Sequence, residues 1–183
     1  MRRPRPRRAG FTLIEISVVV VIAALLVTTA TVNLDRVLPS SRGESAAREL
    51  LSTFDLARTS AVAQGRTYTV EILLEEDRYR ILLPTDADGR PARAPEDRAA
   101  LEWHRLPDGV HFAGVQPAGG EYQERGVYRL DFDLYGGADE LYIHLDNEAG
   151  EGYALTARVI GLTGQAQVIQ GHALPPLVSE ADF

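Results

Sequence analysis

The chain contains no cysteine and no lysine among its 183 residues. Without cysteine it forms no disulfide, and thiol nucleophiles and cysteine-based zinc sites are excluded. The missing cysteine does not decide the compartment, because a domain with a sufficient hydrophobic core can dispense with disulfides. All 19 basic residues are arginine, which we interpret as codon bias of the genome rather than as a requirement of the chemistry.

Positive charge is concentrated at the start of the chain. Residues 1–10, MRRPRPRRAG, hold five arginines and no acid, which gives +5. The remaining residues hold 14 arginines (19 − 5) against 26 acids, which gives −12 and a formal net charge of −7 for the whole chain. Nucleic acids and anionic membranes are bound by positive surfaces. The acidic body therefore disfavours a general binder of either kind.

A long apolar run, Phe11–Val32, follows the arginines and contains Glu15 as its only charge. Its 22 residues would span about 33 Å as a helix, enough for a bilayer core of about 30 Å. We predict a transmembrane helix over this run. Arginines before it place the N-terminus in the cytoplasm by the positive-inside rule. A carboxylate in hydrocarbon is costly and usually has a partner, so Glu15 requires an explanation.

Two ordinary segments compete with this interpretation. A secretory signal peptide would combine the basic start with an apolar stretch and cleavage near Ala30, but a charge within the apolar stretch fits it poorly. A simple signal anchor accounts for the length of the run and leaves Glu15 unexplained.

The order of basic leader, Gly10, Phe11 and then TLIEISVVVVI resembles the signal of type IV prepilins and type II secretion pseudopilins. The resemblance implies that a prepilin peptidase cleaves between Gly10 and Phe11 and methylates the new Phe11 amine. It further implies that Glu15 pairs with the amine of a neighbouring subunit during assembly. Two buried charges become tolerable when they meet. One departure is visible, because major pilins usually carry a proline around Val32 and the first proline after the leader here is Pro39.

The rest of the chain predicts an α+β fold, in which a long N-terminal transmembrane and amphipathic helix packs on antiparallel β-sheets. Pro39 is expected to break or kink the helix, and Ser41 and Glu44 have the spacing of a capping box at which it restarts. An apolar stripe then predicts one buried helix face that ends at Gly65. The residues of the stripe are Ala47, Leu50, Leu51, Phe54, Ala57 and Ala61.

Alternating residues after Gly65 predict a hairpin of Thr67–Leu74 with RYRILL, an exposed loop over 84–100 and a series of short strands. The strands are expected in LEWHRL, GVHFAGV, VYRLDFDL, ELYIHL, YALTARVI and QAQVI. The predicted organisation is a leader over 1–10, a transmembrane helix over 11–32, a periplasmic continuation over 33–65, a β-rich domain over 66–170 and a loosely held tail over 171–183.

Three stretches of the globular part resemble the GspH/FimT family: SAARELLSTFDLARTSAVAQGRTYTVEI, RLPDGVHF and LTARVIGLTGQAQVI. The resemblance implies a minor pseudopilin of the type II secretion pseudopilus, with no enzymatic activity and no cofactor. Expected partners are other pseudopilins, the prepilin peptidase, the inner membrane and secreted substrates. A FimT-like minor pilin of a type IV pilus or competence filament is the alternative within the class. A membrane-anchored periplasmic binding module is the alternative outside it.

Candidate catalytic and metal-binding residues are sparse. The four histidines lack the spacing of a metal site, and His144 alternates with apolar residues as a surface-facing strand residue would. Ser45, in GESAA, lacks the second glycine and the strand-to-helix setting of a nucleophile elbow. The histidines are His104, His111, His144 and His172.

Two acidic turns, one at Asp86 and Asp88 and one over 146–151, do not follow the EF-hand spacing and are predicted to be solvated. Trp103 is predicted to lie in the core. Some FimT-like relatives bind DNA near the final hairpin, but this chain has Gln165 and Gln167 where arginine would be needed for phosphate contacts. Nucleic acid is therefore an unexpected partner.

Overall fold

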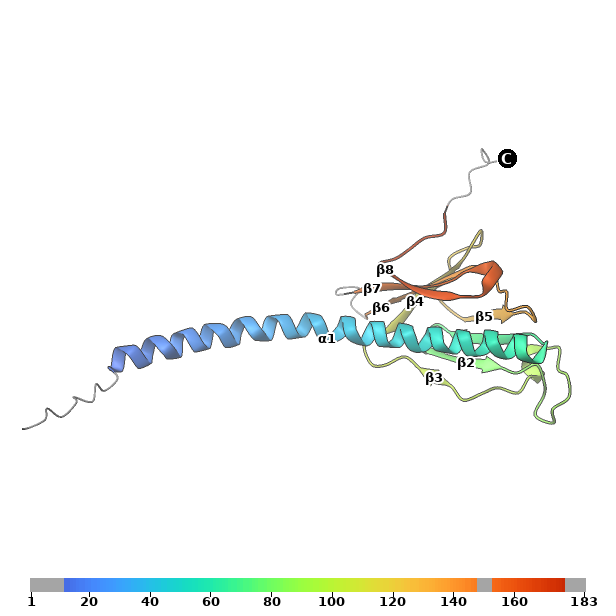
Figure 1. Cartoon of the computed structure of the whole chain (residues 1–183), viewed down its shortest axis with the longest axis horizontal. Helices are drawn as coiled ribbons and strands as arrows, with labels where there is room; N and C mark the ends of the chain where they lie inside the picture. The colour runs from blue at the N-terminus through green and yellow to red at the C-terminus, as the bar shows by residue number, and fades with distance from the viewer. Residues whose placement is uncertain (1–11, 148–152, 177–183) are drawn as a thin grey trace, which may run out of the picture. The chain divides into compact units, whose positions relative to one another are not determined.

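The computed structural model describes residues 12–147 and 153–176, without the side chains of residues 27–40. It divides into two compact units, Met1–Leu38 and Pro39–Phe183, which are described separately below. One long helix is followed by eight strands and two short 3-10 turns (Figure 1). Their bounds are α1 Leu13–Gln64, β1 Tyr68–Leu73, β2 Arg78–Leu82, η1 Pro95–Asp97, β3 His104–Arg105, β4 His111–Pro117, β5 Val127–Phe132, β6 Leu141–Asp146, β7 Ala154–Val159, η2 Gly161–Thr163 and β8 Ala166–Gln170.

Helix α1 continues through Pro39, so the predicted break and restart there are wrong. A proline inside a helix removes one hydrogen bond and costs about 3 kcal/mol, which the long helical segments on its two sides offset. Ser41 and Glu44 therefore lie inside the helix rather than at its start. The Ser45 hydroxyl donates to the Ser41 carbonyl (2.9 Å), as hydroxyls in helix interiors do. The boundary between the two units nevertheless falls at Pro39.

The predicted apolar stripe of α1 is confirmed, and it forms the centre of the core of the second unit. Its members are fully buried, except that Leu51 is partly exposed. The helix ends in a Schellman motif, in which Arg66 donates to the Ala61 carbonyl (3.1 Å) and Gly65 to the Val62 carbonyl (3.4 Å). Gly65 has φ of 61°, a left-handed conformation that glycine adopts without steric cost.

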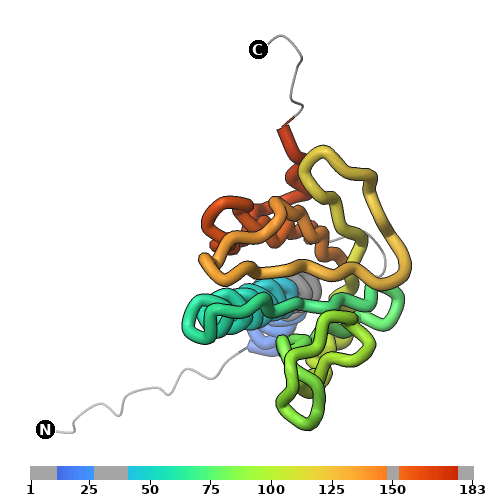
Figure 2. The backbone as a smooth tube through the Cα atoms, turned by 90° about the vertical axis from the view of Figure 1, so that its right-hand side faces the viewer, coloured from blue at the N-terminus to red at the C-terminus, as the bar shows by residue number. Residues whose placement is uncertain are grey.

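The eight strands form two antiparallel sheets, which confirms the predicted α+β class. The first sheet has the order β3-β2-β1-β5 and the second the order β4-β6-β7-β8. The β1–β2 hairpin matches the prediction, and β1 pairs on its other side with β5. Figures 1 and 2 show the C-terminal half of α1 between β2 and β3 on one side and β6, β7 and β8 on the other.

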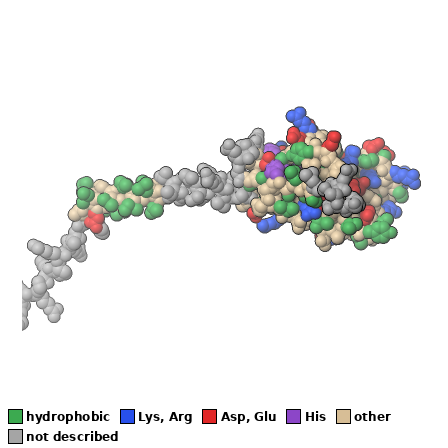
Figure 3. Space-filling model, turned by 90° about the horizontal axis from the view of Figure 1, so that it is seen from above, with side chains coloured by type: hydrophobic (Ala, Val, Ile, Leu, Met, Phe, Trp, Pro, Cys, Tyr) green, Lys and Arg blue, Asp and Glu red, His purple; other side chains and the backbone are tan. Residues whose placement is uncertain are grey.

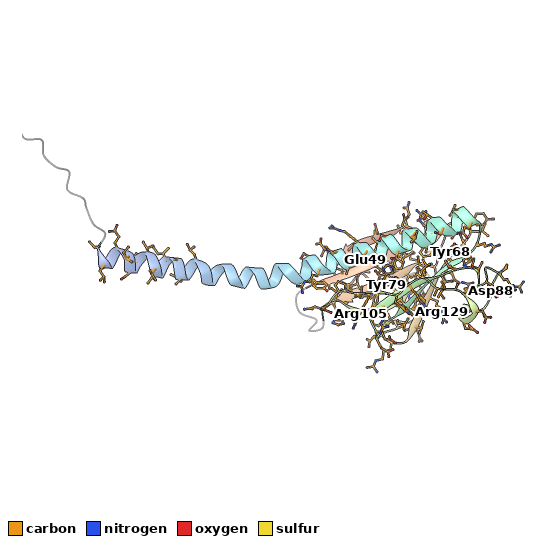
Figure 4. The ribbon with its side chains drawn as sticks, turned by 90° about the horizontal axis from the view of Figure 1, so that it is seen from below. Glu49, Tyr68, Tyr79, Asp88, Arg105 and Arg129 are labelled. Carbon is orange, nitrogen blue, oxygen red and sulfur yellow. The ribbon has the colours of Figure 1, made fainter. Side chains whose placement is uncertain are left out.

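Tyr79 of β2 connects the helix to the first sheet. Its side chain is buried and stacks on His104 of β3, with ring centroids 5.5 Å apart. His104 in turn lies 3.5 Å from the carboxylate of Glu49 on α1. Figure 4 labels Glu49 and Tyr79. Burial raises the pKa of Tyr79, so the phenol stays neutral over the physiological range.

The outer face of the first sheet holds a buried carboxylate, which the alternating pattern of β1 does not predict. Glu71 is 4% exposed and lies between Arg80 of β2 (2.7 Å) and Arg129 of β5 (2.9 Å). The Arg80 guanidinium also lies 4.1 Å from the centre of the Trp103 ring. Trp103 is 36% exposed and covers this arginine, so its predicted place in the core is wrong.

Residues 84–100 are exposed or half-buried, as predicted for a loop, but the chain there is held to the first sheet by backbone bonds. Leu83 donates to Ala99 (2.7 Å) and Ala99 to Thr85 (2.7 Å). Within this loop the Asp86 carboxylate accepts the amides of Asp88 (2.9 Å) and Arg90 (2.8 Å). The first acidic stretch is therefore a turn stabilised by its own carboxylate.

The start of the C-terminal tail is held more firmly than predicted. Gly171 donates to the Ala154 carbonyl (2.8 Å). The Thr156 hydroxyl donates to the Gly171 carbonyl (2.7 Å) and accepts the Ala173 amide (2.9 Å). Residues 177–183, and residues 148–152 of the second acidic turn, lie outside the described residues.

Candidate functional site

The first turn of α1 is organised around Glu15, the residue on which the sequence prediction depends. Thr12 is the N-cap, because its hydroxyl accepts the Glu15 amide (3.3 Å) while its carbonyl accepts the Glu15 and Ile16 amides (3.1 and 3.3 Å). Thr12 and Glu15 therefore have the spacing of a capping box, a signal that the sequence prediction missed. A carboxylate in the first turn also interacts favourably with the helix dipole, by about 0.3–1 kcal/mol.

The Glu15 carboxylate accepts no hydrogen bond and forms no ion pair within residues 12–147 and 153–176. Its side chain is exposed, as are the apolar side chains that follow it on α1. Figure 3 shows hydrophobic side chains on the surface of this first part of the helix. The exposed residues are Leu13, Ile14, Ile16, Val18, Val19, Val20, Val21, Ile22, Leu25 and Leu26.

This segment exposes apolar side chains on all sides. A helix that is hydrophobic all round is normally covered by other helices or by lipid. Among the described residues, none of the helical segments combines the length and the hydropathy needed to cross a membrane. The predicted cleavage and methylation residues, Gly10 and Phe11, lie outside the described residues.

His144 of β6 is buried, which corrects the prediction of a surface-facing residue. Its side chain is 1% exposed and lies between the rings of His172 and Tyr122, with centroids 4.9 and 5.7 Å away. The Thr156 hydroxyl already donates its proton to Gly171. His144 Nδ1 therefore carries a proton and donates to Thr156 Oγ1 (3.1 Å). His144 Nε2 is left buried and without a partner among the described residues.

This environment predicts a loss of stability in acid. Burial, with the adjacent His172 as a smaller cause, lowers the pKa of His144 from 6.5 to about 4. The unfolded chain therefore takes up this proton first, and stability falls as the pH drops from 6.5 towards 4, by up to about 1.4 kcal/mol per pH unit. We expect His144→Phe, which keeps a ring beside His172, to flatten this dependence in urea titrations at pH 7, 6, 5 and 4.

His172→Ala is the matched control, because it removes the neighbouring imidazole and keeps the buried one. Burial also raises the pKa of nearby Asp146, which contributes a pH dependence of opposite sign in both proteins. The His144 contribution is therefore the difference between parent and variant. Equal slopes in parent and His144→Phe would show that this imidazole does not control acid stability.

The last hairpin adjoins an open acidic hollow of about 620 Å³. Its carboxylates are Asp131, Asp133, Asp139 and Glu140, and Arg158 pairs with the last of them (2.6 Å). Gln165 and Gln167 beside it are exposed and uncharged. Carboxylates repel phosphate, whose contacts in proteins come mainly from arginine and lysine.

The other residues considered as catalytic or metal-binding candidates have structural environments that do not fit those roles. Ser45 lies in a helix and donates to the helix backbone. Within the described residues, no three histidine or acidic side chains converge as a metal site would require. The candidate functional surface of the described residues is therefore the exposed apolar part of α1 around the Glu15 carboxylate. The surface of the globular unit is the other candidate.

Comparison with known proteins identifies the N-terminal segment and the fold separately. A family model described as the prokaryotic N-terminal methylation motif matches residues 5–31. That range contains Gly10, Phe11 and Glu15. None of the curated proteins matches the chain.

Solved structures with a similar fold include a minor pseudopilin and a type IV minor pilin. The minor pseudopilin EpsH of the Vibrio cholerae type II secretion system is 17% identical, with a TM-score of 0.53, over 73% of this chain and 97% of that one. Escherichia coli GspH is 16% identical, with a TM-score of 0.51, over 74% and 93%. The Pseudomonas aeruginosa type IV minor pilin FimU is 18% identical, with a TM-score of 0.50, over 75% and 95%.

The sequence resemblance to the GspH/FimT family is thus confirmed in motif and in fold. In this chain a segment that matches the prokaryotic N-terminal methylation motif precedes a domain whose fold is similar to those of EpsH, GspH and FimU.

Proposed function

We propose that the protein is a minor pseudopilin, a structural subunit of the periplasmic pseudopilus of a type II secretion system. The observation that carries the proposal is the Glu15 carboxylate, which has no partner among the described residues and stands among exposed apolar side chains. The methylation motif around it and the fold shared with EpsH and GspH support the same function. The protein acts by assembly and not as an enzyme.

The proposed mechanism begins with proteolysis. Prepilin peptidase removes residues 1–10 and leaves an amine on Phe11, which is then methylated. Before assembly the apolar run Phe11–Val32 anchors the subunit in the inner membrane, with the N-terminus in the cytoplasm and the β-rich unit in the periplasm. When subunits associate, the Glu15 carboxylate of one meets the N-terminal amine of a neighbour. Each charge offsets the desolvation of the other, and the apolar side chains of α1 pack against other helices.

The test is a pair of measurements on Glu15→Ala. An amine left unpaired in hydrocarbon costs about 2.5–3.5 kcal/mol, which corresponds to roughly a hundredfold lower incorporation into filaments. We expect intact-mass analysis of the same variant to find the parental N-terminus, N-methyl-Phe11, because the variant leaves Gly10 and Phe11 unchanged. Glu44→Ala, at a partly exposed position of the same helix, is the matched control and should incorporate normally.

Normal incorporation of the Glu15→Ala subunit would refute the role of the carboxylate. An uncleaved N-terminus in the parent protein would refute the whole proposal and favour the membrane-anchored periplasmic binding module instead.

The minor pilin of a type IV pilus or competence filament is the second candidate, favoured by the likeness to FimU. Deletion of the gene separates the two. A pseudopilin deletion stops export of secreted enzymes and leaves twitching and DNA uptake intact, whereas a minor pilin deletion has the opposite effect.

A further inference from the structure

The two sheets expose four edge strands, β3 and β5 in the first and β4 and β8 in the second. Edge strands can pair with other chains, and proteins block them with charge, proline, bulges or short length. Three of these edges are blocked. Strand β3 has only two residues, β5 carries Arg129 and Asp131, and β4 has a register shift and ends at Pro117. Strand β4 is also covered by a bridge between Val115 and Gln123.

Strand β8, with the sequence AQVIQ, has none of these protections. Bonds between Gly171 and Ala154 and between Gln165 and Ile160 fix which of its backbone groups face β7. Because these groups alternate along an antiparallel pair, Ala166, Val168 and Gln170 direct their amides and carbonyls away from β7. Within the described part of the chain, these six groups make no hydrogen bond.

The stretch of sequence that contains β8 has no charged side chain. From Gly161 to Ser179 the sequence contains no arginine, aspartate or glutamate, although a quarter of the chain is charged. Two of the most exposed large apolar side chains of the globular unit lie on either side of β8. Leu162 precedes it and is 98% exposed, and Leu174 follows it and is 69% exposed.

We propose that the β8 edge pairs with β8 of a second copy of this chain, antiparallel and centred on Val168. Val168 then opposes Val168 of the second copy, and Ala166 opposes Gln170. These are the residues with free backbone groups, so each opposed pair exchanges two hydrogen bonds. The inference does not depend on the proposed secretion function.

The symmetry of the edge favours a second copy over an unrelated strand. Leu162 lies in the turn before β8 and Leu174 lies beyond its other end. In an antiparallel pair of β8 strands, the end that carries Leu162 in one copy meets the end that carries Leu174 in the other. Because β8 has no charged side chain, the two paired strands place no like charges directly opposite each other.

The absence of cysteine allows a cross-linking test that is specific for register. In the proposed pair, Gln167 of one copy opposes Ile169 of the other in a non-hydrogen-bonded position, with Cα atoms about 4.5 Å apart, within disulfide range. Full-length Gln167→Cys and Ile169→Cys chains are mixed in detergent and oxidised gently. We expect a disulfide-linked dimer in the mixture, in up to about half of the chains, the statistical share of mixed pairs. Either variant alone should give little, because its cysteines are diagonal, with side chains about 7–8 Å apart.

Gln170→Pro, added to both chains, supplies the blocking control. It removes an amide that points away from β7, so the β7–β8 pairing is kept, and we expect the cross-link to fall at least tenfold. Ala166→Pro removes the corresponding amide at the other end and is used if Gln170→Pro does not fold by circular dichroism. Gln64→Cys mixed with Gln167→Cys measures random collision.

A mixture that cross-links no better than the Gln64→Cys control overturns the proposal. A cross-link that survives in the folded proline variant also overturns it. So does a cross-link that is equally strong with Gln167→Cys alone, because the register would then differ from the one proposed.

Discussion

Truncation of Phe54 to alanine is expected to lower the free energy of unfolding of the globular unit by about 3–5 kcal/mol. Phe54 is fully buried in the middle of the apolar stripe of α1, and its ring lies 6.2 Å from that of Phe132 on β5. The substitution removes the ring from the contact between helix and first sheet and leaves a cavity there. Domains of this size have total stabilities of about 5–15 kcal/mol, so the variant should be close to unfolding at 37 °C.

Urea titration followed by circular dichroism measures this loss, and Leu56→Ala is its control. Leu56 lies on the same helix and is about half exposed, so its truncation should change stability by no more than about 0.5 kcal/mol. Equal effects of the two substitutions would show that the helix does not pack on the sheets through the stripe described here.

The second large effect is expected from Glu71→Ala, which should cost about 3 kcal/mol. Removing one partner of a buried ion pair leaves the other charge buried and unpaired, which lowers the free energy of unfolding by about 3–5 kcal/mol. We expect a value at the lower end of this range, because Arg80 and Arg129 are partly exposed and can be hydrated by water once the carboxylate is removed. Thermal unfolding at neutral pH measures the loss.

Glu44→Ala is the control for charge removal. Glu44 pairs with Arg48 on the helix surface, where the arginine side chain is 74% exposed, and such pairs contribute about 0–1 kcal/mol. A double variant, Glu71→Leu with Arg129→Leu, should recover part of the loss by replacing charge with apolar packing. If Glu71→Ala is no more harmful than Glu44→Ala, the buried carboxylate is not a structural element of the sheet.

Much of the fold could be predicted because local patterns and tertiary structure agree. The stripe from Ala47 to Ala61, the left-handed end at Gly65 and the β1–β2 hairpin follow from periodicity and turn chemistry. All eight strands lie where apolar alternation predicts them. The pairing of β1 with β5 could not be predicted in this way, because no local signal selects a partner that is separated from β1 by three other strands in the sequence.

Two of the wrong predictions have the same cause, a contact with a part of the chain that is distant in sequence. His144 alternates with apolar neighbours as a surface residue would, yet the segment after β8 lies over it through His172. Trp103 was expected inside because it is large and apolar, but it covers Arg80 on an outer face. Pro39 was expected to break or kink the helix, but the proline alone does not reveal the length of α1 or the burial of the apolar stripe that follows it.

The residues of the candidate site could be predicted from the sequence, whereas the exposed strand edge could not. Glu15 stands out in the sequence because a lone charge in an apolar run is costly, and its place beside Gly10 and Phe11 follows from the motif. The capping of the helix by Thr12 is also a sequence signal, since threonine and glutamate three residues apart begin many helices. The unpaired edge of β8 cannot be predicted from the sequence, because which strands lie at the edge of a sheet depends on the strand order.

The strand order of the first sheet also has a consequence for the timing of folding. Tyr68 pairs with Phe132, which follows it by 64 residues (132 − 68). At a synthesis rate of about 5–20 residues per second, Phe132 emerges from the ribosome roughly 3–13 s after Tyr68. During that interval the β1–β2 hairpin can form, but one side of β1 and the Phe54 face of the helix have no partner. The nascent chain is therefore most prone to misassociation after its hairpin is made and before β5 arrives.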